Sequence, residues 1–489
     1  MSSGDWDEVD RLLDEDFYFY LFSDPDLLER VYLAAPSDWY ERHPRNAMSR
    51  AIAAASRRQL FLVDDSAKEQ FAQWLRSQEH PATVDLLMQQ QSQLRALITA
   101  GRYGEAAAVA DEELKLVRAG DLERFHDALP VVLLACGTAK LLVAEVEDAI
   151  SLYAEALSWA TMRFEHPVAR FAREHLALAY AIAERHRQAR ELLEAESGEW
   201  HEPGDVRYHY QQPGIVARLL VAATDGDGPL RLPDDQARAI DAGPWWWVPI
   251  HARALGAVLS GEPWDAIHEI THALLVQRIR SAPRSLAGAT LRTDLVTLYQ
   301  SAGDLRQAEG VLSTNTLNHH WVGMQLARAR QAWLLGNPDG ALSLLHDEPS
   351  SGGPLVHQAA RAVLYAEAER AASGSVNSRT LQYVASVVDA SGSRISVTQA
   401  SAELRASLAP LLKTPVEEIP VRFSARRPPR LTRREREVLD ALAKEMSVPQ
   451  LAKALHVSQN TVKSHLRALY QKLGAHNREE ALWLARATE

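Results

Sequence analysis

One kind of turn recurs along most of the chain, and it limits the fold more than any other feature of the sequence. In each copy a stretch with helical periodicity ends, the turn carries glycine, asparagine or a charged residue, and a second helical stretch begins at a small residue. The copies lie at residues 101–106, 145–149, 185–189, 261–266, 303–308 and 336–341. Their closing alanines are 43, 40, 77, 42 and 33 residues apart, and the interval of 77 would hold two units. This spacing predicts paired helices that repeat with a period near 40 residues.

The closing alanines mark the points where the paired helices pack closely. The same offsets of four and seven residues recur in Ala149, Tyr153 and Ala156 and again in Ala266, Ile270 and Ala273. The pattern resembles tetratricopeptide-like repeats, although its units are longer and looser than the 34-residue type. One unit cannot bury its own apolar face, so the resemblance implies stacking into a superhelix with a concave surface. The alternative is a helical domain without repeats.

Composition and punctuation divide the chain into three parts. Residues 1–90 show helical patterns broken by Asp-Pro and Ala-Pro pairs, without strand-like alternation, so we expect an all-α body over residues 1–412. Four prolines mark residues 413–430 as a linker: Pro415, Pro420, Pro428 and Pro429. Its arginines could contact phosphates, but a solvated tether is the favoured interpretation: Arg422, Arg426, Arg427 and Arg430. The third part is residues 431–489.

Three adjacent tryptophans follow a stretch that interrupts the repeat. Prolines and glycines break the helical pattern over residues 197–249, and Trp245, Trp246 and Trp247 then stand at the entry to a helix. Three successive indoles on a helix point in different directions, so one or two of them should belong to the core. The third could line a groove for a ligand or partner, which is the sharper of the two interpretations.

Residues 268–272 match the H-E-x-x-H pattern of zinc peptidases, in which two histidines bind the metal and the glutamate activates water. His268 and His272, however, lie two and six residues after Ala266, at offsets that the repeat assigns to the outer face. No third ligand follows in a recognisable context. The chain also lacks a phosphate-binding G-x-x-x-x-G-K-[ST] loop. We therefore expect no enzyme activity, no metal and no cofactor.

The composition is that of a globular protein with two or three domains, at 489 residues, 46% hydrophobic and 24% charged. A single cysteine, Cys136, excludes an internal disulfide and fits a reducing compartment. Residues 1–16 are acidic, and the longest apolar run, residues 129–136, is far too short to span a membrane. The sequence therefore predicts a cytoplasmic protein without membrane contact.

Charge is distributed unevenly along the chain. Residues 422–489 hold 14 lysines and arginines against 7 aspartates and glutamates, a net charge of +7. Residues 1–421 hold 39 and 57, a net charge of −18, which gives −11 for the whole chain. An acidic body joined to a basic tail suits a protein in which only the tail meets a polyanion.

The tail reads as four short helices with clear start signals. Thr432 and Glu435 form a capping box for the first helix, whose apolar stripe is Val438, Leu439 and Leu442. Ser447 and Gln450 open a second helix that buries Leu451 and Leu455, and a turn at His456-Val457 ends it. Gly474 provides a left-handed stop after the third helix, and Asn477 with Glu480 caps the fourth.

The third helix carries two different faces. Ser458 caps it with Thr461 at the third position, and its buried face should consist of Val462, Leu466, Leu469 and Leu473. At about 100° per residue, a polar and basic face lies well away from that row and contains Lys463, Ser464, Arg467 and Gln471. Two capped helices with a tight turn, the second with a cationic face, are what insertion into the major groove requires. The alternative is helix-turn-helix packing that never meets nucleic acid.

The segments LTRREREVL (431–439) and SQNTVKSHLRALYQKLG (458–474) resemble the LuxR/GerE family of bacterial transcription regulators. The resemblance runs through Arg478 and Ala481 but covers only about an eighth of the chain. It implies base contacts by Lys463, Ser464 and Arg467, and phosphate contacts by Ser458 and Thr461. Lys472, near the end of the same helix, is also expected to contact phosphate. It places a dimer contact on the fourth helix, at Glu480, Trp483, Leu484 and Ala487. The chain departs from the family at Glu445 and at residues 448–450, so the first turn could close differently.

Together these observations predict a bacterial, sequence-specific transcription regulator. Its body resembles that of MalT-type members without their ATPase domain, and we expect it to sense a small-molecule or protein effector. The expected partners are double-stranded DNA, a second copy of the chain on DNA, and RNA polymerase. The alternative is an interaction scaffold whose tail does not bind DNA.

Overall fold

The computed structural model describes most of the chain. The described residues are 6–57, 64–120, 126–162, 166–195, 206–225, 232–314, 321–346, 355–392, 394–413, 419–425, 431–444, 446–473, 475 and 477–487. They form helices and no strand, as the sequence predicts. Two compact units divide the chain: Met1–Ala257 with Trp264–Asp294, and Val258–Pro263 with Leu295–Glu489. In the described parts no helix combines the length and the apolar composition that crossing a bilayer requires.

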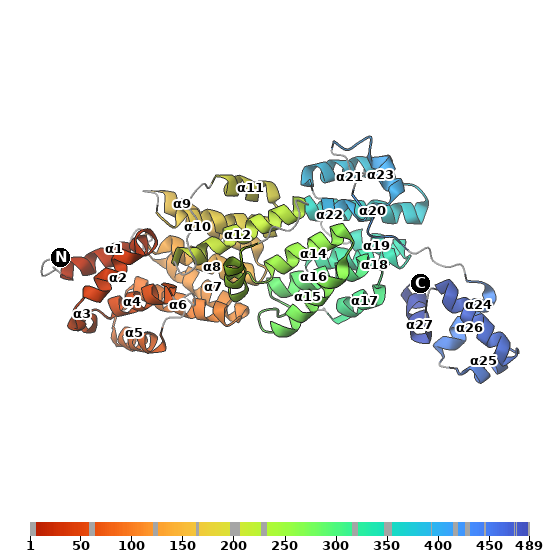
Figure 1. Ribbon diagram of the computed structural model, residues 1–489, viewed down its shortest axis with the longest axis horizontal. Helices are drawn as coiled ribbons and strands as arrows, with labels where there is room; N and C mark the ends of the chain where they lie inside the picture. The colour runs from red at the N-terminus through yellow and green to blue at the C-terminus, as the bar shows by residue number, and fades with distance from the viewer. Residues whose placement is uncertain are drawn as a thin grey trace. The chain divides into compact units, whose positions relative to one another are not determined.

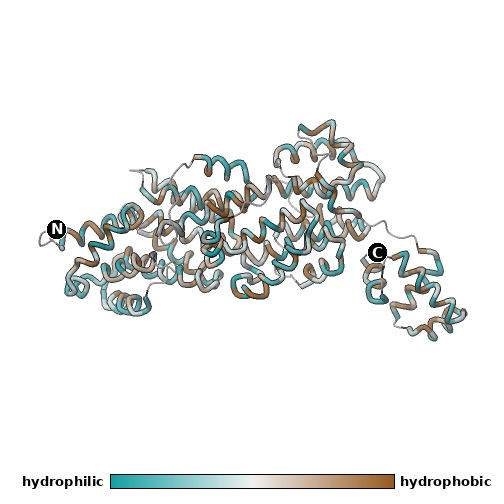
Figure 2. Tube along the Cα trace, viewed as in Figure 1, coloured by the Kyte–Doolittle hydropathy of each residue, from teal (hydrophilic) through white to brown (hydrophobic). Residues whose placement is uncertain are grey.

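Figure 1 labels most of the helices, and Figure 2 shows that hydrophobic and hydrophilic residues alternate along most of them. In chain order, the helices before the three tryptophans are α1 (Trp6–Ser23), α2 (Pro25–Ala34), α3 (Ser37–Arg42), α4 (Pro44–Arg57), α5 (Asp65–Ser77), α6 (Thr83–Thr99), α7 (Tyr103–Ala119), α8 (Leu129–Leu142), α9 (Val146–Met162), α10 (Ala169–Ile182), α11 (His186–Glu194), α12 (Val206–Asp225) and α13 (Asp234–Ala242). The helices between the tryptophans and the linker are α14 (Val248–Ser260), α15 (Pro263–Val276), α16 (Leu286–Ser301), α17 (Leu305–Thr314), α18 (Val322–Leu334), α19 (Pro338–His346), α20 (Leu355–Ser373), α21 (Ser378–Ser391), α22 (Arg394–Val397) and α23 (Ala402–Leu408). The tail holds α24 (Arg433–Ala443), α25 (Val448–Ala454), α26 (Gln459–Leu473) and α27 (Arg478–Ala487).

All six predicted turns share one backbone geometry. Five residues before each closing alanine, the backbone takes a left-handed φ of +57° to +83°, at Gly101, Ala144, Glu184, Gly261, Gly303 and Gly336. At five of these turns the N–H of the left-handed residue donates to the carbonyl three positions before it. The N–H of the next residue donates to the carbonyl five positions before itself, which is the pattern that ends a helix. The six alanines are at most 7% exposed. The recurring turn predicted from sequence therefore corresponds to a recurring structural unit, a helix, a left-handed residue and a second helix.

A buried polar cluster joins three of the repeat helices. Gln91 of α6 donates from Nε2 to both carboxylate oxygens of Glu113 on α7, at 2.9 Å each, and Cys136 Sγ of α8 lies 3.4 Å from Glu113 Oε2. Glu113 is fully buried. Burial raises the pKa of Glu113 to about 7, although the bonds from Gln91 and Cys136 act in the opposite direction.

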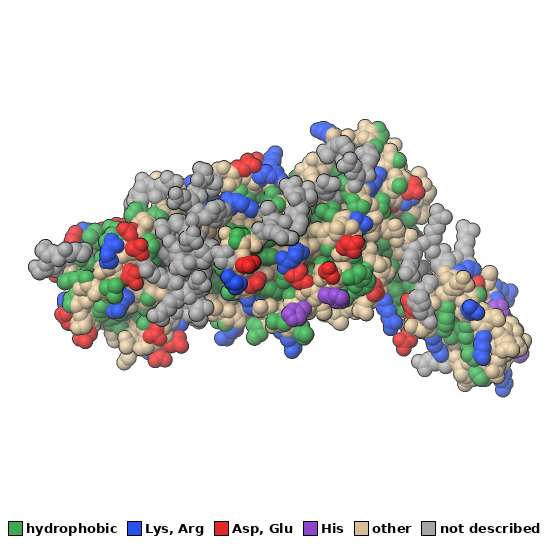
Figure 3. Space-filling model, in the orientation of Figure 1, with side chains coloured by type: hydrophobic (Ala, Val, Ile, Leu, Met, Phe, Trp, Pro, Cys, Tyr) green, Lys and Arg blue, Asp and Glu red, His purple; other side chains and the backbone are tan. Residues whose placement is uncertain are grey.

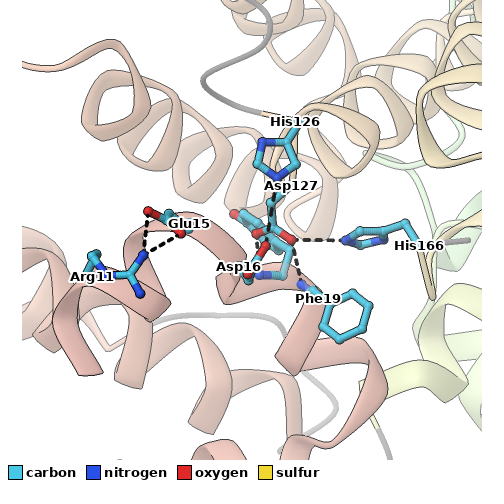
Figure 4. Close-up of polar contacts among 8 residues, drawn as sticks. Arg11, Glu15, Asp16, Phe19, His126, Asp127 and His166 are labelled. Atoms are coloured by element: carbon cyan, nitrogen blue, oxygen red, sulfur yellow. Dashed lines mark hydrogen bonds and ion pairs between the residues drawn. The ribbon is translucent and has the colours of Figure 1, made fainter. Parts of the chain in front are cut away.

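Helix α1 is broken at Asp16, where φ is −135° and ψ is 30°. The N–H groups of Tyr18 and Phe19, just after the break, donate to Asp127 Oδ2 and Oδ1 at 2.7 Å each (Figure 4). His166 Nδ1 accepts the N–H of Val168, so its Nε2 carries the proton and donates to Asp127 Oδ1 across 3.1 Å. Asp127 therefore caps a half-helix more than a hundred residues away in sequence and fixes the entry to α10 at the same time.

The three tryptophans lie in a turn that leads into α14, and the structure buries all of them. Trp245, Trp246 and Trp247 are 2%, 3% and 1% exposed. The guanidinium of Arg280 lies over the ring of Trp246, 5.6 Å from its centroid. The core interpretation of the cluster thus holds for each indole, and a ligand or partner groove at this place stays a prediction.

Part of the predicted linker packs on the body. Residues 419–425 follow α23, and Ile419 and Phe423 are only 5% and 3% exposed. Arg422, which was predicted to lie in a solvated tether, forms hydrogen bonds with the body. Residues 426–430, with Arg426, Arg427 and Arg430, lie outside the described residues.

Candidate DNA-binding interface

The four tail helices enclose an apolar core of their own. The stripe predicted for α24 is buried, and Leu451 of α25 and Ala481 of α27 are fully buried. The core residues are Val438, Leu439, Ala441, Leu442, Leu451, Ala452, Val462, Leu469, Leu473, Ala475, Ala481, Leu484 and Ala485. Leu455 and Leu466, which were predicted to be buried, are half-buried. This core holds α26 in place while leaving its other face open.

The capping box at the start of α24 is formed as predicted. The Thr432 N–H donates to Glu435 Oε2 at 2.7 Å, and the Glu435 N–H donates to Thr432 Oγ1 at 3.3 Å. Lys472 of α26 adds an ion pair, with 2.7 Å between its Nζ and Glu435 Oε2. The bond from Lys472 and then that from Thr432 hold the pKa of Glu435 below its usual value.

The turn between α25 and α26 is built from local backbone bonds. The Ser447 N–H donates to Gln450 Oε1 at 2.8 Å, which is the predicted start of α25. At its end, His456 has a left-handed φ of 52°, and the Val457 N–H donates to the Ala452 carbonyl at 3.0 Å. This is the same kind of helix stop that recurs in the body, and it lets α26 begin two residues later.

Helix α26 presents the predicted polar face to solvent. Ser458 caps the helix, because its Oγ accepts the Thr461 N–H at 3.1 Å and the two hydroxyls lie 2.8 Å apart. The side chains expected to meet DNA are all exposed: Lys463, Ser464, Arg467 and Gln471, with Ser458, Thr461 and Lys472 beside them. Within the described residues, Lys463 and Arg467 form no ion pair. On the face shown in Figure 3, lysine and arginine side chains lie over this domain.

Two tail arginines serve the fold, a role that the sequence did not reveal. Arg434 of α24 donates to the Leu455 carbonyl at the end of α25 and also pairs with Glu437. Arg478 of α27 donates to the carbonyls of Leu442 and Met446. The last carbonyls of a helix lack partners within it, so a guanidinium satisfies them. Arg434 and Arg478 therefore connect helices within the tail domain.

The predicted dimer residues of α27 differ in exposure. Leu484 is 4% exposed and packs inside the tail domain, whereas Glu480 and Trp483 are half-buried. The Glu480 N–H donates to Asn477 Oδ1 at 2.9 Å, which confirms the predicted cap. The side chain of Ala487 lies outside the described residues, as do Gly474 and Glu445.

The zinc-peptidase pattern has the geometry of a helix surface. His268 and His272 are exposed on α15, and Glu269 forms an ion pair with Arg253 of α14. Among the described residues, no group of three or more potential ligands could hold a metal ion. The carboxylate of Glu269 is thus already paired with an arginine of the neighbouring helix.

Comparison with known proteins matches residues 429–485 to the bacterial regulatory proteins of the luxR family. A stretch of 54 residues, 11% of this chain, is 39% identical to spore germination protein GerE of Bacillus subtilis and covers 73% of that protein. Over 54 residues the chain is 46% identical to the probable transcriptional regulatory protein NarL of Mycobacterium tuberculosis and 52% identical to the probable transcriptional regulatory protein SgaR of Hyphomicrobium methylovorum. These matches again cover 11% of this chain, but only 25% of NarL and 26% of SgaR. Because GerE is matched over most of its length, the chain belongs to the luxR family of bacterial regulatory proteins, through residues 429–485.

Proposed function

We propose that the chain is a sequence-specific transcription regulator that binds double-stranded DNA through α26. The observation that carries this proposal is the exposed face of α26, where Lys463, Ser464 and Arg467 stand together while the opposite face is fixed in a core. Side chains on one face of a capped helix can reach base edges in the major groove. The names of NarL and SgaR, which describe them as probable transcriptional regulatory proteins, support the same function.

The proposed contacts fall into two classes. Lys463, Ser464 and Arg467 read base edges, since they share the exposed face. Ser458 and Thr461 at the helix start and Lys472 near its end contact phosphates, which position the helix without reading sequence. A second copy of the chain binds beside the first on DNA through α27, where Glu480 and Trp483 keep part of their surface open.

The helical body is the proposed sensor. Residues 1–421, which contain it, have a net charge of −18 and are therefore a poor ligand for DNA, so its role is to respond to an effector or to dock a partner such as RNA polymerase. The recurring helix pairs support a stacked superhelix, because each pair needs a neighbour to cover its apolar face.

Selection of binding sites from a pool of random duplexes by the full-length protein tests the proposal. We expect enrichment of one short motif and a steep fall of affinity with salt. In Arg467→Ala the enriched motif should lose its preference at one base position, whereas Arg436→Ala, which removes an exposed arginine of α24, should keep the whole motif. A full-length protein that binds no duplex even at low salt would identify the chain as an interaction scaffold instead.

A further inference from the structure

Residues 419–425, here called the strap, lie between the body and the tail and are fastened to the body. The Arg422 N–H donates to the Thr398 carbonyl at 2.9 Å. Its guanidinium donates to the Leu259 carbonyl near the end of α14, from Nη2 at 2.7 Å and from Nε at 3.2 Å. The predicted tail begins at residue 431, six residues after the end of the strap.

Phe423 of the strap covers a buried cation. Its ring lies over the guanidinium of Arg330 on α18, with 4.8 Å between Cζ and the ring centroid. Arg330 is 9% exposed, and its Nη1 lies 3.3 Å from both Thr297 Oγ1 and Gln300 Oε1, which are neutral acceptors. Its buried Nε has no hydrogen-bond partner. The ring of Phe423 therefore covers a buried guanidinium that donates to two neutral acceptors.

No carboxylate among the described residues pairs with Arg330. Burial lowers its pKa to about 10, because a charged group in an apolar surrounding loses its hydration. A buried charge without a counterion is costly, and a face-on aromatic ring compensates only part of that cost. The arrangement would be stabilised by an anion at the guanidinium.

The neighbouring amides are held in position around Arg330. Gln300 Nε2 donates to the Ala327 carbonyl at 2.8 Å and lies 3.1 Å from Gln331 Oε1. Gln331 Nε2 in turn donates to the Leu305 carbonyl at 2.8 Å. The side-chain amides of Gln300 and Gln331 are thus both oriented by backbone carbonyls. Gln300 Oε1 is left directed at Arg330. These amides therefore help to hold the guanidinium beside the strap.

We propose that Arg330 is the binding group of a site for a small oxyanion, a carboxylate or a phosphate, that Phe423 closes in this structure. An oxyanion that takes the place of the ring pairs with the fork of the guanidinium, including its free Nε. Entry displaces Phe423, loosens the strap and frees the tail. The proposal names the chemical class of the effector and so rests on the proposed function, but the binding site is testable without DNA.

Trypsin cleavage after Arg422 reports on the strap in the full-length protein, because that residue is bound to the body when the strap is closed. Cleavage at this bond, identified by mass spectrometry, should accelerate with inorganic phosphate or with citrate but not with chloride at equal ionic strength. If phosphate accelerates cleavage at a lower concentration than citrate, the site prefers a phosphate, and the reverse order indicates a carboxylate. No acceleration in either arm would overturn the proposal.

Three variants locate the effect. Arg330→Met should abolish the dependence on phosphate and citrate, and a retained dependence would overturn the proposal. Phe423→Ala should tighten binding of the active anion, measured by calorimetry, roughly tenfold, because the competing ring is gone. Ile419→Ala is the comparison, since it removes an apolar contact of the strap but leaves the ring over Arg330, so its gain in anion affinity should be clearly smaller than that of Phe423→Ala. An equal gain in the two variants would overturn the competition between the ring and the anion.

The outcome remains decisive if Arg330→Met does not fold. In that case Phe423→Ala carries the test, and absence of calorimetric binding to both phosphate and citrate would overturn the site. A strap that responds to the anion in a protein that binds no duplex would refute only the proposed function. A protein that binds duplex but whose strap ignores both anions would refute only the anion site.

Discussion

Lys472 near the end of α26 pairs with Glu435 in the first turn of α24, with 2.7 Å between Nζ and Oε2. Glu435 also completes the capping box with Thr432. The ion pair therefore connects the helix proposed to enter DNA with the start of the domain's first helix. A cation proposed to touch phosphate already has a structural partner, and the two roles can be separated by experiment.

For Lys472→Ala we expect a weakening of binding that is the same for all duplex sequences. Loss of one phosphate contact should lower the slope of log affinity against log salt by about one unit. The measurement is a salt titration on the selected site and on an unrelated duplex, with Lys453→Ala on α25 as control. A loss confined to the selected site would place Lys472 at a base instead.

Arg467→Ala should have a different effect from Lys472→Ala, because the forked donors of the Arg467 guanidinium can bind a guanine edge. We expect a loss of about 1–3 kcal/mol on the preferred site and relaxed preference at one base position. Competition binding across single-base variants of the site measures both effects. If Arg467→Ala and Lys472→Ala gave the same uniform loss, α26 would have to sit in the groove in another register.

Glu113 should make stability depend on pH in a defined direction. Its carboxyl has a pKa of about 7 in the folded chain against 4.5 for the ordinary group, so folding favours the protonated form. The stabilisation is fully present below pH 4.5 and is lost as the pH rises to about 7, by roughly 3 kcal/mol.

Urea unfolding of the unaltered protein and of Glu113→Gln at several pH values tests this expectation. The variant lacks the titrating group, so the difference in unfolding free energy should shift in its favour between pH 4.5 and 7. Burial lowers the pKa of His175 to about 4, so this residue changes the stability with pH in the opposite direction. His175 is present in both proteins, so its effect cancels in the difference. A difference that stays constant with pH would contradict the raised pKa of Glu113.

His456→Gly should stabilise the tail, because His456 holds a left-handed φ of 52° that glycine adopts without strain. The expected gain is about 0.5–1 kcal/mol. Ala454→Gly, at the end of α25, serves as the comparison and should lose about 1 kcal/mol from lower helix propensity. Thermal unfolding of the two variants should therefore shift in opposite directions, and equal shifts would contradict the strain at His456.

Local signals in the sequence predicted the local structure well. The capping boxes and the alanines that close the turns depend on residues a few positions apart, so their spacing was visible in the chain. The buried tryptophans were harder to place, because residues 245–247 lie in a turn where side chains do not follow helical spacing. Arg434 and Arg478 bind carbonyls of other helices, and no sequence spacing indicates such partners.

Residues 419–425 of the predicted linker pack on the body and do not form the expected solvated tether. The prolines and arginines of this stretch suggested a tether, but composition cannot tell which single residue packs against the body. Ile419 and Phe423 are apolar residues within that stretch, and both are buried. Their presence in a polar segment was the available signal, while the partner at Arg330 could be found only from the folded chain.

The left-handed turns of the body also bear on how the protein is made. Each one joins two helices that follow each other in the chain, and neighbouring helices such as α6 and α7, α7 and α8, and α8 and α9 pack together. Contacts between nearby residues form fast, and domains fold as they leave the ribosome from the amino terminus onward. The acidic body can therefore be complete while the basic tail is still being synthesised, so the tail emerges from the ribosome beside a body that is already folded.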